Sequence, residues 1–164
     1  RIVEISVSVY QGQNLLDSLS TLVNPGRPIP EDSSAVHRIY DADVTDAPRW
    51  EQIQDRVLKF FDTDRPIVAH GIAFDTRMLR QECGDALRLS PLTFCTMEYA
   101  KRKHPVLSLR KKGHRLEDLA VFFDIPFDAN AAHGADYDVA ILAAVTIAMM
   151  KDIPVQRVIP GFVG

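Results

Sequence analysis

The first 23 residues of the chain show the alternating pattern of a β-hairpin. Apolar residues stand at every second position from Val3 to Val9, and polar residues stand between them. This period of two is typical of strands with one buried face. The segment 11–14 has the composition of a turn, so 15–23 is predicted to be the returning strand. The prolines and glycine of 24–30 then interrupt regular structure.

Four later segments show the spacing of amphipathic helices, with apolar residues three or four positions apart. We predict helices over 50–60, 74–83, 116–123 and 135–150. The apolar run Ile67–Ala69 predicts a short buried strand. The segment 91–101 fits either a strand or a helix, and the basic segment 101–115 is predicted to be mostly loop. Together these elements predict a mixed α/β fold in which helices cover the faces of a central sheet.

Length and composition indicate one globular domain. The chain has 164 residues, of which 46% are apolar and 25% are charged, and this is enough for a single hydrophobic core. We assign 1–150 to this domain and 151–164, with its prolines and glycines, to a tail or linker. The net charge of −3 gives no sign of nucleic-acid binding. A nuclease that gathers carboxylates around metal ions can nevertheless be acidic overall and carry a local basic track.

The cysteines and the hydropathy of the chain are typical of a cytoplasmic protein. Cys83 and Cys95 have no neighbouring ligand pair, so they are predicted to be small buried residues in a reducing cytoplasm. No apolar run is long enough to span a membrane, and no targeting signal is recognisable. We therefore expect a cytoplasmic protein without a membrane partner. The chain enters a strand pattern directly at Arg1, and we expect the natural protein to continue upstream.

Two short segments each combine a histidine with a carboxylate. His70 follows the predicted buried strand and Asp75 lies at the next helix start, while His133 precedes the long helix and Asp138 lies on its first turns. Carboxylate oxygens hold Mg²⁺ or Mn²⁺, and a pair of such ions neutralises the charge that develops during phosphodiester hydrolysis. A histidine that titrates near neutrality is suited to deprotonating water. The alternative for both acids is an ordinary favourable charge in a first helical turn.

These two segments resemble the second and third motifs of the DEDDh exonucleases. This family belongs to the ribonuclease H-like superfamily and includes the proofreading subunit of bacterial replicative DNA polymerase. Residues 70–75 are similar to the family's His-Asn-x-x-Phe-Asp, and residues 133–138 to its His-x-Ala-x-x-Asp. Further matching stretches occur in order at 1–5, 24–30, 36–39 and 116–125. The likeness extends from residue 1 to about 150, and the order and spacing of the motifs make it specific.

The resemblance implies a ribonuclease H-like exonuclease fold and a site for two Mg²⁺ or Mn²⁺ ions. Asp138 would bind one ion directly, Asp75 would support the second largely through water, and His133 would be the general base. The residues that would contact the terminal nucleotide or shape its pocket are His37, Ile39, His70 and Phe74. The implied reaction is the 3'–5' release of nucleoside monophosphates from a single-stranded 3' end of DNA or RNA.

The family's first motif, Asp-x-Glu, is absent from this sequence. In the family it lies on a central strand just before the hairpin that opens this chain. Loss of that strand would leave buried backbone groups unpaired at about 1–3 kcal/mol each, against a total stability of about 5–15 kcal/mol. We therefore expect a strand with these two carboxylates upstream of Arg1. Glu4 is interpreted as the family's structural glutamate in the next strand and not as a substitute ligand.

Two positions depart from the family pattern, and the basic segment has two possible interpretations. Gly71 stands where the family usually has Asn, and Arg38 where it has Gly. The basic residues of 101–115 fit a phosphate track or a solvated face equally well, and charge reversal at Lys111 and Lys112 tests the track. His104 and His114 are predicted to be solvated.

Two classes of function remain. One is the exonuclease, with a fused or associated polymerase or another nucleic-acid-processing domain as its expected partner. The other is a non-catalytic nucleic-acid-binding or adaptor domain derived from an exonuclease.

Overall fold

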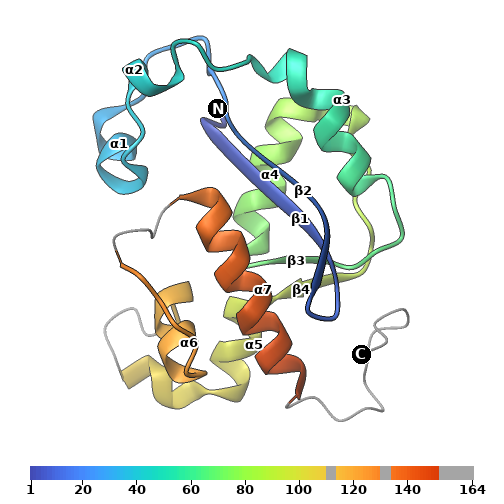
Figure 1. Cartoon of the computed structure of the whole chain (residues 1–164), viewed down its shortest axis with the longest axis vertical. Coiled ribbons are helices and arrows are strands. Elements are labelled where there is room, and N and C mark those ends of the chain that lie inside the picture. The colour runs from blue at the N-terminus through green and yellow to red at the C-terminus, as the bar shows by residue number, and fades with distance from the viewer. Residues whose placement is uncertain (110–113, 130–133, 152–164) are drawn as a thin grey trace.

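The computed structural model describes residues 1–109, 114–129 and 134–151 (Figure 1). The elements in chain order are β1 (Glu4–Gln11), β2 (Asn14–Leu22), α1 (Glu31–His37), α2 (Asp41–Val44), α3 (Trp50–Phe61), β3 (Ile67–Ala69), α4 (Ile72–Cys83), η1 (Gly84–Ala86), β4 (Thr93–Cys95), α5 (Thr96–Lys103), η2 (Pro105–Leu109), α6 (Leu116–Phe122) and α7 (Ala135–Lys151). The predicted mixed α/β fold is confirmed. Of the predicted tail 151–164, only Lys151 lies within the described residues.

The strands form two pairs. β1 and β2 are antiparallel, with Glu4 opposite Leu22 and an irregularity between Val9 and Tyr10, so the predicted hairpin is confirmed. β3 pairs with β4 in parallel. Parallel strands need a crossover between them, and α4 with η1 provides it.

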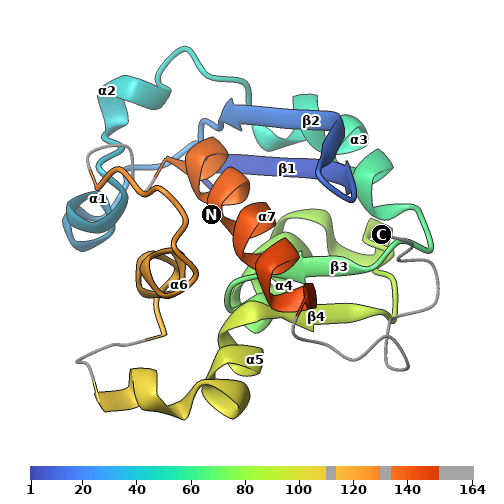
Figure 2. The ribbon, with the colours of Figure 1, turned by 60° about the horizontal axis from the view of Figure 1, so that its bottom comes forward.

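Each of the four strands has one edge without a strand partner in the described part of the chain. Among the described residues β1 pairs only with β2, and β3 only with β4. Figure 2 shows the order β2, β1, β3, β4 from top to bottom, with α7 in front. β1 and β3 therefore each have one edge without a strand partner in the described part of the chain, and these edges belong to the two inner strands.

Most of the predicted helices are confirmed. α3, α6 and α7 agree with the predicted ranges within one residue, and α4 begins two residues earlier than expected. The ambiguous segment 91–101 contains both β4 and the start of α5. The prediction of loop for 101–115 is wrong for its first part, because α5 continues to Lys103 and η2 follows.

Two hydrophobic clusters hold these elements together. The hairpin cluster joins β1 and β2 to α3 and α4, and its members are Ile5, Leu19, Val23, Trp50, Ile53, Val57, Leu79 and Cys83. The α7 cluster joins α5, η2, α6 and α7, and its members are Tyr99, Ala100, Leu107, Leu119, Ala120, Ile141, Val145 and Met149. Burial of large apolar side chains is the main stabilising contribution in each cluster.

The two cysteines differ in their burial, and the described helices are too short or too polar to span a membrane. Both cysteines are free; Cys83 is buried in the hairpin cluster, as predicted, whereas Cys95 is only half-buried. In the described ranges, no helix has both the length and the apolar character needed to cross a membrane.

Candidate functional site

The start of α7 is attached to the start of β1. The backbone N–H of Ala135, the first residue of α7, donates a 3.1 Å hydrogen bond to Oε2 of Glu4, the first residue of β1. Asp138 lies in the same first turn, and its own N–H donates to the carbonyl of Gly134 at 3.0 Å. The predicted catalytic acid therefore stands on a helix turn that a distant carboxylate holds.

Glu4 lies among negative charges. Its pKa is raised first by burial and then by the nearby carboxylates of Asp136 and Asp138, while the bond from Ala135 lowers it. Like charges close together disfavour the ionised form. The structural interpretation of Glu4 from the sequence therefore covers only part of its surroundings, because this side chain also faces the predicted catalytic helix.

The start of α4 carries Asp75. Gly71 precedes the helix with φ = 99°, a conformation that side-chain-bearing residues rarely adopt. Asp75 lies in the first turn, and partial burial of its carboxyl raises its pKa. The residue as a whole is exposed, so its oxygens keep access to water.

His70 links three segments of the protein. Its Nδ1 lies 3.0 Å from Oγ1 of the buried Thr96, and Thr96 Oγ1 donates to the carbonyl of Ala69 at 3.4 Å. Burial is the main cause that lowers the pKa of His70, and a hydrogen bond to the backbone of His114 opposes this effect. These bonds join the end of β3 to the start of α5. The predicted part of His70 in shaping the substrate pocket stays a prediction.

The remaining predicted substrate residues lie at the end of α1, just after it, and on α4. His37 ends α1, and its Nδ1 accepts a 3.1 Å bond from the N–H of the buried Ile39. Arg38 between them has φ = 60°, which explains why the family usually has glycine at this position. Phe74 is 58% exposed, with the guanidinium carbon of Arg77 5.3 Å from its ring centre. An exposed aromatic face of this kind is available for stacking on a base.

The two helix starts that carry Asp75 and Asp138 lie at the same end of the molecule. Since β1 and β3 run in opposite directions, β1 begins and β3 ends at the same end of the molecule, where α4 and α7 also begin (Figures 1 and 2). Among the described residues no group of three or more His, Cys, Asp or Glu side chains is close enough to hold a metal ion. His133, the predicted general base, lies outside the described residues.

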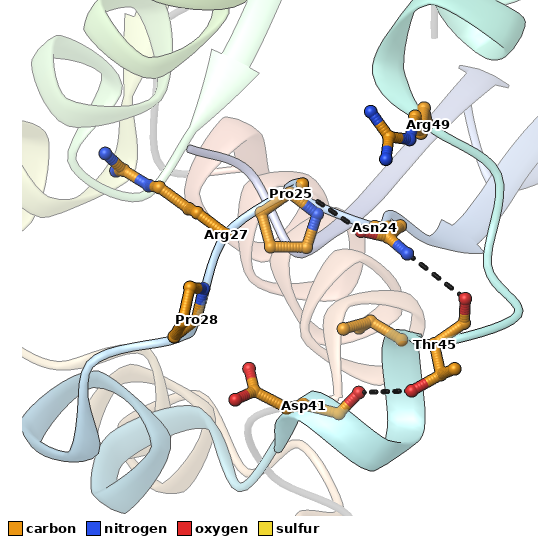
Figure 3. A pocket seen from close by; sticks show the side chains of 9 residues that line it. Asn24, Pro25, Arg27, Pro28, Asp41, Thr45 and Arg49 are labelled. Atoms are coloured by element: carbon orange, nitrogen blue, oxygen red, sulfur yellow. Dashed lines mark hydrogen bonds between the residues drawn. The ribbon is translucent and has the colours of Figure 1, made fainter.

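A surface recess lies beside α2, away from the starts of α4 and α7. It has a volume of about 310 Å³ and is formed by 24–28, by α2 and by Arg49 (Figure 3). Its shape is fixed by Asn24, whose Nδ2 donates to the carbonyl of Thr45 at 3.1 Å. None of the predicted site residues lines this recess, so it is not the predicted active site.

The basic segment is partly neutralised by its own acids. Lys101 pairs with Glu98 at 2.8 Å, and Arg115 pairs with Asp118 at 3.1 Å. These local pairs favour a solvated face for the described part of the segment. Lys111 and Lys112 lie outside the described residues.

The prediction that His104 and His114 are solvated is wrong for His104. Its ring centre lies 4.7 Å from that of Phe122 and 5.5 Å from that of Phe123, and its buried Nε2 has no hydrogen-bond partner among the described residues. His114 is half-buried, with Nε2 3.4 Å from the carbonyl of His104. His104 therefore packs on two phenylalanines at the end of α6, which the sequence pattern around the histidine does not reveal.

Comparison with known proteins gives matches over nearly the whole chain. A family model described as Exonuclease matches residues 1–146. Exodeoxyribonuclease 10 of Escherichia coli strain K12 is 33% identical over 156 residues, which are 92% of this chain and 62% of that protein. The DNA polymerase III subunit epsilon of Treponema pallidum is 29% identical over 142 residues, 86% of this chain and 64% of that protein.

A solved structure is also similar. Exonuclease X in complex with 5' overhanging duplex DNA superposes with a TM-score of 0.64 at 24% identity, covering 95% of this chain and 87% of that one. At this identity the likeness concerns the fold. The chain spans less than two thirds of the length of the first two relatives, 62% and 64%.

Proposed function

Since the chain belongs to the Exonuclease family, we propose that it is the metal-dependent 3'–5' exonuclease domain of its protein. It would release nucleoside monophosphates from single-stranded 3' ends of DNA or RNA. The structural likeness to exonuclease X confirms the predicted ribonuclease H-like architecture. The direction of degradation, the strand preference and the metal requirement are part of this proposal.

The observation that carries the proposal is the placement of Asp138. It stands in the first turn of α7, close enough to Glu4 for the two charges to affect each other, and the N–H of Ala135 in that turn is bonded to Glu4. A buried or half-buried carboxylate is costly beside others of the same sign. A divalent cation bound there would offset that repulsion, and this supports the proposal of a metal site.

The donor set fits hard divalent cations. Asp138 and Asp75 offer carboxylate oxygens, the ligands that Mg²⁺ and Mn²⁺ prefer, and Asp75 is exposed enough to act through water. Two such ions, when bound, would neutralise the charge on the scissile phosphate and on the entering and leaving oxygens. Asp138 would hold one ion directly and Asp75 would support the other.

The other residues would orient the substrate and move a proton. His133 would take a proton from the attacking water on an imidazole nitrogen. Ile39 and His37 would pack against the terminal nucleotide, and the exposed ring of Phe74 would stack on a base. His70 would hold the pocket wall through its bond to Thr96.

The open edges of β1 and β3 give a place for the expected Asp-x-Glu strand. A strand lying between them would pair with both and would satisfy backbone groups that lack a strand partner among the described residues. We propose that this strand supplies the two further carboxylates. Its sequence in the full-length gene product checks this directly, and a strand without acids at that place would remove the catalytic assignment.

Degradation of labelled oligonucleotides tests the proposed activity. The full-length protein with Mn²⁺ is expected to shorten a 5'-labelled single strand one nucleotide at a time, and to release labelled mononucleotide at once from a 3'-labelled strand. His133→Ala and Asp138→Ala are expected to abolish both. Asp136→Ala, in the same first turn as Asp138, is the matched control and is expected to retain activity.

The controls separate the assigned roles from a general effect on α7. Equal degradation by all four proteins would remove the roles of His133 and Asp138. Equal loss in Asp136→Ala would show that the negative charge of the helix start matters, and not the specific acid. Release of mononucleotide first from the 5' end would refute the proposed direction.

One observation favours the alternative of a non-catalytic nucleic-acid-binding or adaptor domain. Within 1–109, 114–129 and 134–151, no three metal-binding side chains gather in one place. The two functions predict different outcomes for the same full-length protein. An adaptor would bind the single strand with and without Mn²⁺ and leave its length unchanged.

A further inference from the structure

The carboxylate of Glu4 makes one of the longest-range side-chain bonds of the described structure. Oε2 accepts the N–H of Ala135 at 3.1 Å, and the two residues are 131 positions apart. The first N–H groups of a helix have no partner within the helix and need an acceptor from outside. A carboxylate is a strong acceptor there, because the helix start also carries a partial positive charge.

The bond lies at one end of a longer contact in which α7 packs along β1. Ile5, next to Glu4, belongs to the hairpin cluster. Ile141 and Val145 of α7 belong to the α7 cluster. Figure 1 shows the start of α7 beside the first residues of β1. The Glu4–Ala135 bond therefore holds the first turn of α7 against the start of β1.

The turn that Glu4 holds is the turn that carries Asp138. The N–H of Asp138 bonds to the carbonyl of Gly134 at 3.0 Å, so Ala135 and Asp138 move as parts of one helical turn. The carboxylates of Asp136 and Asp138 lie near enough to disfavour the charge of Glu4. An uncharged acceptor would fix the helix without this repulsion, so the bond and the charge can be separated by substitution.

We infer that Glu4 is a positioning residue for the reaction: through the N–H of Ala135 it holds Asp138 in place to receive a divalent cation. This inference rests on the proposed function. Groups that orient metal ligands typically change metal affinity or activity by about 10- to 100-fold when they are removed. Glu4 itself is not proposed as a ligand.

Three variants of the full-length protein test this role. Glu4→Ala removes the bond, and Glu4→Gln keeps a side-chain oxygen for Ala135 without the charge. Glu82→Ala is the control for the loss of a long-range carboxylate, because Glu82 accepts the backbone N–H of Ile2 at 2.9 Å and also pairs with Arg1 at 3.1 Å. Glu82 lies at the other end of α4 from Asp75.

Two readouts are measured for each variant. The first is amide hydrogen exchange at Ala135 without metal, which is expected to be faster in Glu4→Ala and unchanged in Glu4→Gln and Glu82→Ala. The second is the Mn²⁺ concentration that gives half-maximal cleavage of a labelled oligonucleotide. It is expected to rise about 10- to 100-fold in Glu4→Ala, to stay near wild type in Glu4→Gln and to be unchanged in Glu82→Ala.

The outcomes distinguish the inference from the proposed function. If Glu4→Ala changes the Mn²⁺ requirement no more than Glu82→Ala does, Glu4 only stabilises the fold. If Glu4→Gln is as impaired as Glu4→Ala, the charge and not the bond is what counts, and the inference is wrong. If the wild-type protein cleaves nothing, the proposed function fails, and the exchange rate at Ala135 still decides whether Glu4 holds the start of α7.

Discussion

The helices α4 and α7 begin with the same local sequence pattern and have different surroundings. Both starts read His-Gly-x-x-x-Asp, over 70–75 and 133–138, and in both an aromatic residue precedes the acid. Phe74 is 58% exposed. Tyr137, its counterpart, accepts a hydrogen bond from the backbone N–H of Asp128 and packs on Phe127 with ring centres 5.9 Å apart.

Asp75 and Asp138, the acids of the two helix starts, also differ in what surrounds them. Burial alone accounts for the raised pKa of Asp75, whereas Asp138 lies within electrostatic range of Glu4 on a distant strand. The local pattern thus places an acid in the first turn of each helix, and residues far away in the sequence set the charge around it. The resemblance to the family is what assigns direct metal binding to Asp138 and support through water to Asp75, and the difference in surroundings agrees with that proposal.

Replacement of the two acids is expected to show the largest difference. Asp138→Asn should lower the single-turnover cleavage rate by roughly 1,000-fold, since a direct metal contact contributes several kcal/mol to the transition state. Asp75→Asn should lower it by about 10- to 100-fold, the usual effect of an indirect contact. Rates measured with saturating Mn²⁺ give the comparison. Equal losses in both variants would erase the distinction between the two helix starts.

Replacement of the two aromatic residues should have opposite consequences. Tyr137→Ala is expected to lower the free energy of unfolding by about 2–4 kcal/mol, because a packed ring is lost. Phe74→Ala should cost less than about 1 kcal/mol, the value of an exposed cation–π contact. It should instead weaken oligonucleotide binding by about 1–3 kcal/mol if the ring stacks on a base. Urea unfolding and fluorescence binding measure the two effects, and similar destabilisation by both variants would contradict this account.

Gly71 at the start of α4 allows a smaller test. With φ = 99°, Gly71→Ala is expected to cost about 1–2 kcal/mol of stability from the backbone alone, because a Cβ there would meet its nearest atom, Met97 Cε, at an ordinary 3.9 Å. Activity should also fall, since His70 and Asp75 flank this turn. Gly12→Ala at the hairpin tip, with φ = 58° and free space around it, is the matched control. It should lose stability and keep its activity.

The smallest expected effect is a pH dependence from His70. Burial lowers its pKa in the folded protein, so the unfolded chain binds the proton more tightly. The free energy of unfolding should therefore decrease as the pH falls through the ordinary histidine pKa of about 6.5. His70→Asn, whose amide takes the place of Nδ1 beside Thr96, should make this decrease shallower. A slope identical to that of the wild type would show that His70 titrates alike in both states.

Periodicity alone predicted the elements that bury one face. The hairpin, α3, α6 and α7 have regular apolar spacing and β3 is a short apolar run, and the structure has each of them. α1 and α2 were not predicted, because they are short and carry few apolar residues between Pro30 and Pro48. Their local signal is the acids of their first turns, Glu31 and Asp32 in α1 and Asp41 and Asp43 in α2, which are typical of a helix start.

The candidate site was predictable only in its local part. The spacing in 133–138 placed Asp138 on a first helical turn, and the structure has it there. The bond from Ala135 to Glu4 spans 131 positions, and the contact of His70 with Thr96 spans 26. A single sequence holds no periodicity that links such residues, so these contacts follow only from the packed fold. The packing of His104 on Phe122 and Phe123 was missed for the same reason.

Titration of Mn²⁺ into the full-length protein, followed by calorimetry, tests the central claim most directly. We predict that the wild-type protein binds Mn²⁺, that Asp138→Asn loses most of this binding, and that Asp75→Asn binds more weakly than the wild type but more tightly than Asp138→Asn. Unchanged binding in Asp138→Asn would contradict the assignment of the start of α7 as the metal site.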